Sequence, residues 1–250
     1  MSDFIGTKLT MNLGERSYDI ILKNGALENL YQFARLDRKV AVVTDSGVPA
    51  EYAQRVADQC RESTIITVPQ GEASKSFKIL ETVLRQMLEF NMGRGDLVVA
   101  VGGGVVGDLA GFAAAIYMRG IDFINCPTTT LSMIDSSIGG KTAVDLGDTK
   151  NIVGAFWQPK LVIVDPATLP RRHYINGLAE AVKAGLLADP ELFAIFEKGD
   201  IDTQISEIIY RSLRFKKNVV EQDETERGMR KALNFGHTIG HGIEAVKGIK

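Results

Sequence analysis

The sequence predicts an α/β fold in which an N-terminal Rossmann-like nucleotide-binding domain is followed by an all-helical domain. Between residues 18 and 165, short apolar runs rich in β-branched residues alternate with longer amphipathic stretches, a pattern typical of crossover units on a parallel sheet. After residue 170, every periodic stretch has the spacing of a helix. This change of pattern predicts a boundary near 166–171, which gives domains at 1–168 and 169–250.

Each strand is predicted from a short apolar run that ends in a turn. The clearest run is 96–101, which leads directly into three glycines. Strands are expected at 18–22, 40–43, 63–68, 96–101, 122–126 and 161–165. Helices are expected at 26–34, 50–61, 77–90, from the glycines to 118, and then at 176–187, 190–198, 201–220 and 227–246.

Composition narrows the class of protein. The chain has 250 residues, of which 45% are hydrophobic and 24% charged, so it can build one large core or two ordinary ones. A net charge of -2 gives no field for binding nucleic acid or an anionic membrane, so neither is expected as a partner. Cys60 and Cys126 form no disulfide framework, and no stretch has the character of a signal peptide or a membrane span. We therefore expect a soluble, cytoplasmic protein.

A glycine-rich turn follows the strand at 96–101. Gly102, Gly104 and Gly107 match the dinucleotide-binding pattern, in which glycines let the backbone approach a pyrophosphate at a helix N-terminus. Such turns are common, and it is the strand before and the helix after that favour a nucleotide site here. Asp45 also follows a strand, and the loop 69–76 follows another, so their polar residues belong to the same edge of the sheet. Charges in that loop can equally be solvated.

The segment 135–142 contains a glycine pair followed by a lysine and a threonine, and superficially resembles a phosphate-binding P-loop. It does not fit, because Asp135 stands where that motif requires a glycine, and Lys141 opens no long apolar helix. Lys141 therefore needs another explanation.

The predicted helix at 227–246 carries a row of polar side chains along one face. Arg230, Asn234, His237, His241 and Glu244 recur at helical spacing and would form one stripe. Two histidines one turn apart can share a metal ion or a phosphate, although an ordinary pair of helix histidines is the alternative. An arginine and an asparagine beside them suit an anionic, hydroxylated ligand.

Glu180 and Lys183 lie three residues apart on another predicted helix. A surface ion pair is the common outcome of that spacing. The alternative is a carboxylate metal ligand next to an anion-binding lysine, and Glu180, His237 and a third donor would then make an open zinc site.

Several of these stretches together resemble the dehydroquinate synthase family of sugar-phosphate cyclases. The matching strings are GGGVVGDLAGF at 102–112, YMRG at 117–120, PTT at 127–129, IDSSIGGKTAVD at 134–145, NGLAEAVK at 176–183 and LNFGHTIGH at 233–241. The resemblance implies a nucleotide-binding domain and a helical domain with the active site between them. It also implies NAD and a divalent metal, Zn²⁺ or Co²⁺, as cofactors. The substrate would be a phosphorylated sugar acid, 3-deoxy-D-arabino-heptulosonate 7-phosphate, converted to 3-dehydroquinate and phosphate in the shikimate pathway. We also expect a homodimer.

The resemblance assigns roles to individual positions. Glu180 and His237 resemble the metal ligands of the family. The substrate and phosphate shell would consist of Arg119, Asp135, Lys141, Lys183, Lys216, Arg230, Asn234 and His241. The NAD contacts would be Asp45, Glu72, Lys75, Gly103, Gly104, Val105, Val106, Gly107, Asp108, Thr128, Thr129, Lys141, Lys150 and Thr168.

The chain departs from the family pattern in two places. It stops at Lys250, before the segment whose His-Gly-Glu motif supplies the third metal ligand, so we expect it to bind NAD but to turn over poorly alone. The loop 145–151 lacks the proline and glycine usual before Lys150. The alternatives are another cyclase, such as 2-deoxy-scyllo-inosose synthase, a metal-dependent polyol dehydrogenase, and an inactive NAD-binding fragment.

Overall fold

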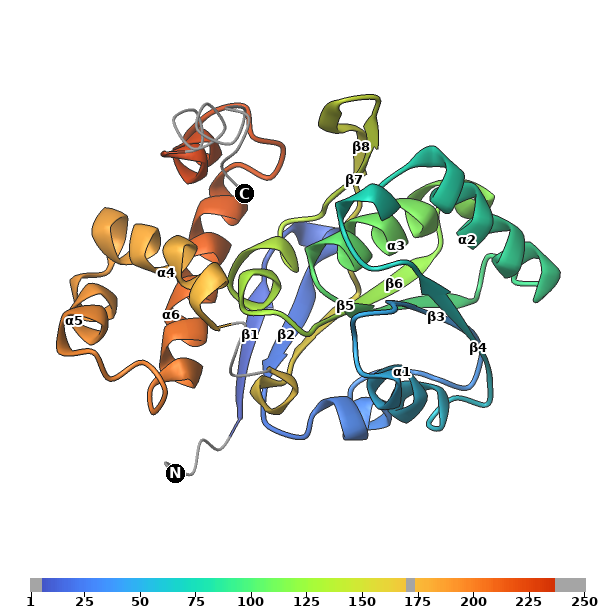
Figure 1. Ribbon diagram of the computed structural model, residues 1–250, viewed down its shortest axis with the longest axis horizontal. Coiled ribbons are helices and arrows are strands. Elements are labelled where there is room, and N and C mark those ends of the chain that lie inside the picture. The colour runs from blue at the N-terminus through green and yellow to red at the C-terminus, as the bar shows by residue number, and fades with distance from the viewer. Residues whose placement is uncertain (1–5, 170–173, 237–250) are drawn as a thin grey trace.

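The computed structural model describes residues 6–169 and 174–236, and its centre is a mixed β-sheet (Figure 1). In the described residues this sheet has seven strands in the order β1-β2-β9-β6-β5-β3-β4, and only β1 runs antiparallel to its neighbour. Its strands are β1 (Thr7–Met11), β2 (Tyr18–Leu22), β3 (Lys39–Asp45), β4 (Glu62–Val68), β5 (Leu97–Gly102), β6 (Asp122–Pro127) and β9 (Leu161–Val164). Strands β7 (Lys141–Leu146) and β8 (Thr149–Phe156) form a separate hairpin that projects from the body.

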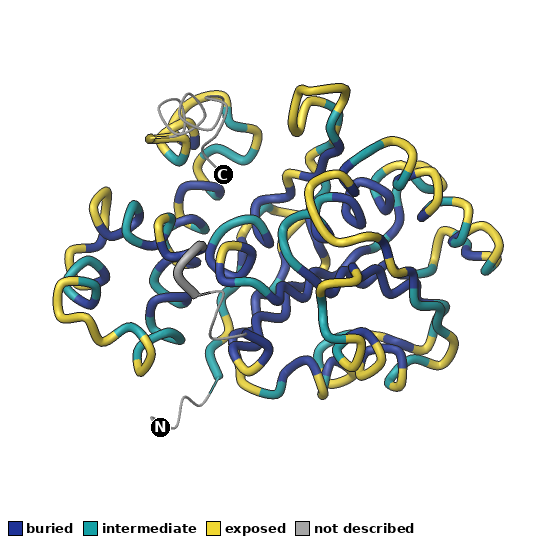
Figure 2. The backbone as a smooth tube through the Cα atoms, in the orientation of Figure 1, coloured by how far each residue is buried: buried dark blue, intermediate teal, exposed yellow. Residues whose placement is uncertain are grey.

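Alternating side chains of the strands pack against two different layers of helices, one on each face of the sheet. Val40 and Val42 pack with α1 (Ala50–Ala57) on one face, whereas Ala41 and Val43 pack on the other. All four are fully buried, because parallel strands with helices on both sides carry apolar residues in both directions. That other face is covered by α2 (Phe77–Glu89) and α3 (Gly104–Ile116). Figure 2 shows the strands as the most continuously buried part of the molecule.

The helices α4 (Tyr174–Ala188), α5 (Pro190–Lys198) and α6 (Ile205–Gln222) lie beside the β1–β2–β9 half of the sheet. Ile20 and Val162, which are register partners, share a core with Ala181 and Ile208 of the helices. Asn125 of β6 is the register partner of Val162 on one side and of Ala100 on the other. The Ala100 side chain packs under α3. Asn125 therefore marks the place on the sheet where the two groups of helices meet.

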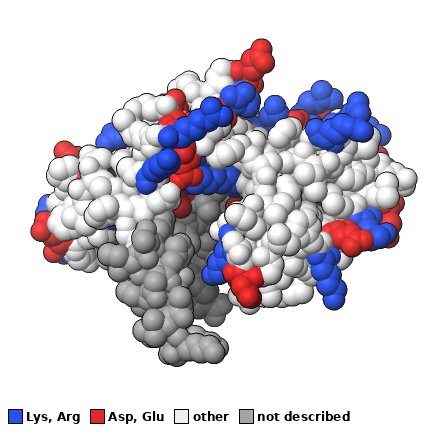
Figure 3. Space-filling model, turned by 90° about the horizontal axis from the view of Figure 1, so that it is seen from above, with Lys and Arg blue, Asp and Glu red and all other residues white. Residues whose placement is uncertain are grey.

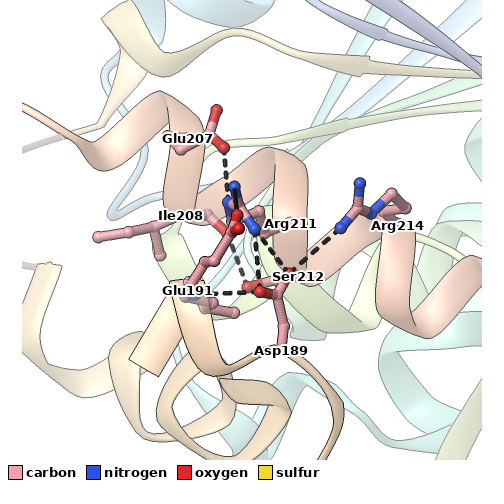
Figure 4. Close-up of polar contacts among 8 residues, drawn as sticks. Asp189, Glu191, Glu207, Ile208, Arg211, Ser212 and Arg214 are labelled. Atoms are coloured by element: carbon pink, nitrogen blue, oxygen red, sulfur yellow. Dashed lines mark hydrogen bonds and ion pairs between the residues drawn. The ribbon is translucent and has the colours of Figure 1, made fainter. Parts of the chain in front are cut away.

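A cluster of ion pairs fixes α5 against α6 (Figure 4). The Arg211 guanidinium contacts Asp189 at 2.9 Å, Glu191 at 2.5 Å and Glu207 at 2.6 Å. Asp189 also accepts a hydrogen bond from the Leu192 backbone N–H at the start of α5, as an N-cap residue does. Burial alone would raise the pKa of Asp189, but the Leu192 N–H and Arg211 outweigh it and lower that pKa.

The predicted α/β class is confirmed, and most predicted elements lie within a few residues of their observed bounds. Strand β1 and the β7–β8 hairpin were not predicted. The expected helix at 26–34 is a kinked 3-10 segment, Leu27–Gln32, and the expected helices at 50–61 and 201–220 are shorter, ending at Ala57 and starting at Ile205. Within the described ranges, no helix has both the length and the apolar character needed to cross a membrane.

The predicted helix at 227–246 is wrong over its described part. Residues Met229–Asn234 form a 3-10 turn, and Gly236 follows with a φ of 85°, so helical geometry ends there. The Asp223 carboxylate accepts hydrogen bonds from the backbone N–H groups of Gly228 and Arg230, at 2.6 and 3.1 Å. Those N–H groups are directed to a side chain rather than to a helical carbonyl. His237, His241 and Glu244 lie outside the described residues.

Candidate active site

The chain leaves β3 toward one face of the sheet and leaves β5 toward the other, so the carboxyl ends of these strands are the switch point at which open α/β sheets form a ligand crevice. Gly103 caps α3 without a side-chain hydrogen bond, so the first N–H groups of that helix point to the crevice. A Cβ on Gly103 would lie 3.1 Å from Thr129 Cγ2, and one on Gly104 would lie 3.0 Å from Ser136 Oγ. Close packing therefore explains the glycines, and the crevice suits an anionic pyrophosphate.

The residues predicted to contact NAD gather at this edge. Asp45 ends β3 and accepts a hydrogen bond from the Gly47 N–H at 2.7 Å, and the Thr128 N–H donates to the Gly102 carbonyl at 2.9 Å. The Thr168 hydroxyl is buried and donates to the Asp165 carbonyl at 2.8 Å. Each predicted position follows the carboxyl end of a strand, opens α3 or lies on the hairpin: Asp45, Glu72, Lys75, Gly103–Asp108, Thr128, Thr129, Lys141, Lys150 and Thr168.

Lys75 joins the crevice to the β7–β8 hairpin. Its ammonium lies 2.7 Å from the Asp108 carboxylate, also donates to the Asn151 side chain, and is 3.9 Å from Glu72. Burial raises the pKa of Asp108 even though Lys75 opposes that effect. The Asn151 N–H donates to Asp145, whose own N–H donates to the Lys75 carbonyl, both at 2.7 Å. The hairpin is thereby tied to the crevice, and Lys150 lies exposed next to Asn151.

Asp145 and Asn151 were not recognised as site residues. Asn151 has a φ of 57°, a left-handed conformation that asparagine adopts more readily than most residues. The signal in the sequence was the unusual loop 145–151 itself, but without the hairpin pairing it had no structural meaning.

A second group of side chains surrounds Asp135, in the turn Ser132–Ser136. Lys216 of α6 lies 2.7 Å from the Asp135 carboxylate and donates to the Asp135 carbonyl at 2.6 Å. Burial alone would raise the pKa of Asp135, but Lys216, Lys183 and Lys141 together lower it. Burial lowers the pKa of Lys216, with Asp135 opposing. Lys216 thus contacts the Asp135 carboxylate directly, whereas Lys183 and Lys141 act on its charge from further away and pair with Glu180 and Glu226.

Glu180 and Lys183 form an ion pair, as the common interpretation of their spacing predicted. The Lys183 ammonium also donates to the Leu233 carbonyl at 2.5 Å. Within 6–169 and 174–236, no three His, Cys, Asp or Glu residues lie close enough together to hold a metal ion. Of the two predicted metal ligands, Glu180 is described and His237 is not. The described residues therefore do not by themselves make a metal site.

The structure places Arg230, a predicted substrate-binding residue, in a buried position with partners on the backbone. Arg230 is 1% exposed, donates to the carbonyls of Gly139 and Glu224, and stacks 5.8 Å above the Phe156 ring. Burial also lowers its pKa. Its two backbone contacts make it a structural link between the turn after Asp135 and the segment after α6.

Asn234 and Lys141 share one partner that the sequence did not suggest. The Glu226 carboxylate accepts a hydrogen bond from the Asn234 amide at 2.7 Å and forms an ion pair with Lys141. Burial alone would raise the pKa of Glu226, but Lys141 and Asn234 lower it. Glu226 lies outside every periodic pattern and every matching string, so no signal pointed to it.

Among the predicted substrate residues that the structure describes, Arg119 lies apart from the others. It follows the C-terminal end of α3 in the turn Tyr117–Arg119 and is exposed. The helix has 13 residues, which at 1.5 Å per residue places Arg119 about 20 Å from the glycine turn. The sequence string around it could not show at which end of the helix the site would form.

The glycine-lined crevice and the lysines around Asp135 define a class, the nucleotide-dependent α/β enzymes that act on small anionic substrates. Family profiles described as 3-dehydroquinate synthase N-terminal and C-terminal match residues 65–176 and 177–250. The chain belongs to the 3-dehydroquinate synthase family.

Individual relatives agree with this assignment. The 3-dehydroquinate synthase of Pelobacter propionicus is 44% identical over 96% of this chain and 71% of its own length. That of Caulobacter vibrioides is 45% identical over 95% of this chain and 69% of its own length.

Two solved structures are similar as well. A 2-deoxy-scyllo-inosose synthase complexed with carbaglucose-6-phosphate, NAD⁺ and Co²⁺ is 26% identical, with a TM-score of 0.82 over 95% of this chain and 70% of its own. A 2-epi-5-epi-valiolone synthase from Streptomyces hygroscopicus with NAD⁺ and Zn²⁺ bound is 28% identical, with a TM-score of 0.83 over 96% of this chain and 71% of its own.

Proposed function

We propose that this chain carries out the reaction of its family, the conversion of 3-deoxy-D-arabino-heptulosonate 7-phosphate to 3-dehydroquinate and phosphate. The observation that carries the proposal is the closeness of two groups of residues. Gly104 of the nucleotide turn packs so near Ser136 that a Cβ would lie 3.0 Å from its hydroxyl, and Asp135 is the adjacent residue. A nucleotide on the turn would therefore lie beside the lysines that can hold a phosphorylated acid.

NAD is the cofactor that the crevice suits. The uncapped start of α3 would hold its pyrophosphate, with Lys75, Thr128 and Thr129 alongside. When bound, NAD accepts a hydride from a substrate carbinol and later returns it. The solved relatives that contain NAD⁺ support this choice.

The chain's own residues would bind and orient the substrate. Lys183, Lys216 and Lys141 supply positive charge for its carboxylate and phosphate. Asp135, held ionised by these lysines, would accept a hydrogen bond from a ring hydroxyl and fix which carbon faces the nucleotide. The same lysines would stabilise the negative charge on the departing phosphate.

We propose a divalent metal as the second cofactor, since the solved relatives hold Co²⁺ or Zn²⁺. Glu180 and His237 are the positions that we propose as ligands. Glu180 would have to leave its ion pair with Lys183 to take that role. The described residues do not by themselves complete the metal site.

The degree of identity separates the family reaction from that of the other cyclases. The relatives named 3-dehydroquinate synthase are 40–45% identical to this chain, whereas the 2-deoxy-scyllo-inosose synthase is 26% identical. The heptulosonate carries a carboxylate that a hexose phosphate lacks, and three lysines whose charges all act on Asp135 suit two anionic groups better than one.

The direct test is to supply the purified chain with NAD, Zn²⁺ and 3-deoxy-D-arabino-heptulosonate 7-phosphate and to measure 3-dehydroquinate and phosphate together. We expect both products in equal amounts, and a drop of about 100-fold in kcat for Asp135→Asn, because an orienting group is lost. Asp37→Asn, an exposed carboxylate paired with Arg35, is the control and should keep full activity. Phosphate release from glucose 6-phosphate but not from the heptulosonate would reassign the chain to another cyclase activity.

A further inference from the structure

The Glu226 carboxylate lies against two side chains proposed to hold the substrate. One of its oxygens pairs with the Lys141 ammonium and the other accepts from the Asn234 amide at 2.7 Å. The Glu226 side chain is 18% exposed, whereas that of Lys141 is 49% exposed. An internal carboxylate therefore already neutralises a lysine that remains open to solutes.

The turn that carries Glu226 is held in place on both sides. The Asp223 carboxylate accepts from the N–H groups of Arg227 and Gly228, at 2.8 and 2.6 Å. The Glu224 carboxylate pairs with Arg16 at 2.7 Å. Glu226 itself has a φ of 59°, a conformation that is unfavourable for glutamate. The turn thus presents one particular carboxylate to Lys141 at a cost in backbone energy.

Charge on this surface is arranged in opposed pairs. Figure 3 shows acidic and basic side chains gathered beside the hollow between the two parts of the molecule. A cavity of about 810 Å³ adjoins the turn, and its described lining includes Thr225, Glu226, Lys231 and Asn234. The Glu226 side chain therefore borders open space as well as Lys141.

We propose that Glu226 is an internal counterion that competes with the anionic group of the substrate for Lys141 and Asn234, and so sets which anions the site accepts. The inference rests on the proposed function, because it assumes that these two residues bind substrate. A carboxylate and a phosphate cannot share one ammonium at close range without strong mutual repulsion. A dianionic phosphate can displace the glutamate, whereas a neutral sugar cannot. Glu226 would therefore select phosphorylated acids by excluding weaker ligands.

The test is the affinity of inorganic phosphate, measured by calorimetry at fixed ionic strength on the whole chain without NAD or substrate. We expect Glu226→Gln to bind phosphate about tenfold more tightly than the unaltered chain, because an internal competitor is lost. Glutamine keeps an acceptor for Asn234, so the turn should persist. Glu221→Gln is the matched control, since Glu221 pairs with Lys217 at 2.7 Å on α6 and its loss removes the same charge elsewhere.

A second variant guards against failure to fold. Glu226→Asp keeps the charge but shortens the side chain, and it should also tighten phosphate binding, by a smaller factor. Unchanged or weaker phosphate binding in both Glu226 variants would overturn the proposal, and so would an equal gain in Glu221→Gln or no phosphate binding in any variant. Formation of 3-dehydroquinate by the unaltered chain is measured separately, so loss of this inference and loss of the proposed function are distinguishable.

Discussion

At the scale of single residues, Lys75 is the side chain on which the geometry of the nucleotide crevice most depends. Its side chain is 5% exposed, and its ammonium holds Asp108 of α3 and Asn151 of the hairpin together. A buried ion pair adds modest net stability, but removing one partner leaves the other charge buried and unpaired. Lys75 therefore connects three segments through one charged group.

Lys75→Met is expected to lower the free energy of unfolding by about 3 kcal/mol, since the Asp108 carboxylate loses its partner. NAD affinity should fall as well, because the hairpin is released from the crevice. Urea unfolding and a fluorescence titration with NAD measure the two effects. Lys78→Met, at an exposed position of α2, should change stability by less than about 0.5 kcal/mol, and an equal effect of both variants would contradict this account.

The sequence predicted Asp108 from the glycine-rich string that contains it and Lys75 from the family resemblance, but it did not predict Asn151 or Glu226. Asn151 acquires its role through pairing of β7 with β8, and Glu226 acquires its role from a turn held by Asp223 and Glu224. Neither contact follows from local spacing. Local patterns predicted residues within elements, whereas contacts between elements had to come from the structure.

At the scale of elements, Gly177 in α4 illustrates how packing can override helix propensity. A Cβ on Gly177 would lie 2.3 Å from the Leu131 backbone nitrogen and 2.6 Å from Thr130 Cβ. Alanine is normally favoured over glycine in a helix by about 1 kcal/mol. Here the helix needs glycine to approach the turn that carries Asp135.

Gly177→Ala is therefore expected to destabilise the protein by about 1–3 kcal/mol, because a backbone clash outweighs the gain in helix propensity. The midpoint of urea unfolding gives the change. Gly95→Ala serves as the comparison, since a Cβ there meets nothing within 4 Å, and it should be nearly neutral. A stabilised Gly177→Ala protein would show that α4 can shift away from the turn without cost.

The strength of the periodic pattern in each element explains which elements could be predicted. Buried parallel strands and amphipathic helices such as α2 and α5 have strong periodic patterns, and their predicted bounds nearly match the observed ones. The segment after α6 has helical spacing too, but the Asp223 carboxylate and Gly236 end the helical geometry. Periodicity shows which face could be buried, and it does not reveal a side chain that captures the backbone.

At the scale of the whole molecule, stability depends on carboxylates whose pKa values are lowered by basic partners. Burial raises and nearby cations lower these pKa values, with a net decrease for Asp135, Asp189, Glu221, Glu224 and Glu226. A carboxyl group whose pKa is lowered by folding stabilises the folded state at pH values above its ordinary pKa, which is 3.8 for Asp and 4.5 for Glu. This stabilisation disappears as the pH falls through the pKa of the group in the folded state. Asp108, whose pKa is raised, acts in the opposite direction.

We therefore expect the free energy of unfolding to fall steeply between about pH 5 and pH 3. Asp189→Asn should cost about 1–3 kcal/mol at pH 7, since its hydrogen bonds to Arg211 and Leu192 lose a charged acceptor. Once the pH falls below the lowered pKa of Asp189 in the folded state, the variant and the unaltered chain should become equally stable. Urea unfolding at a series of pH values checks this, and a difference that stays constant with pH would exclude the ionised carboxylate as the cause.

The pairing of β2 with β9 also has a consequence for how the protein is made. Ile20 is synthesised early, yet its register partner Val162 and the covering residue Ile208 come much later. Until then the early hairpin has an open edge and an apolar surface without its partners, which favours association with other chains. A ribosome-bound nascent chain of this protein should accordingly depend on chaperones for most of its synthesis.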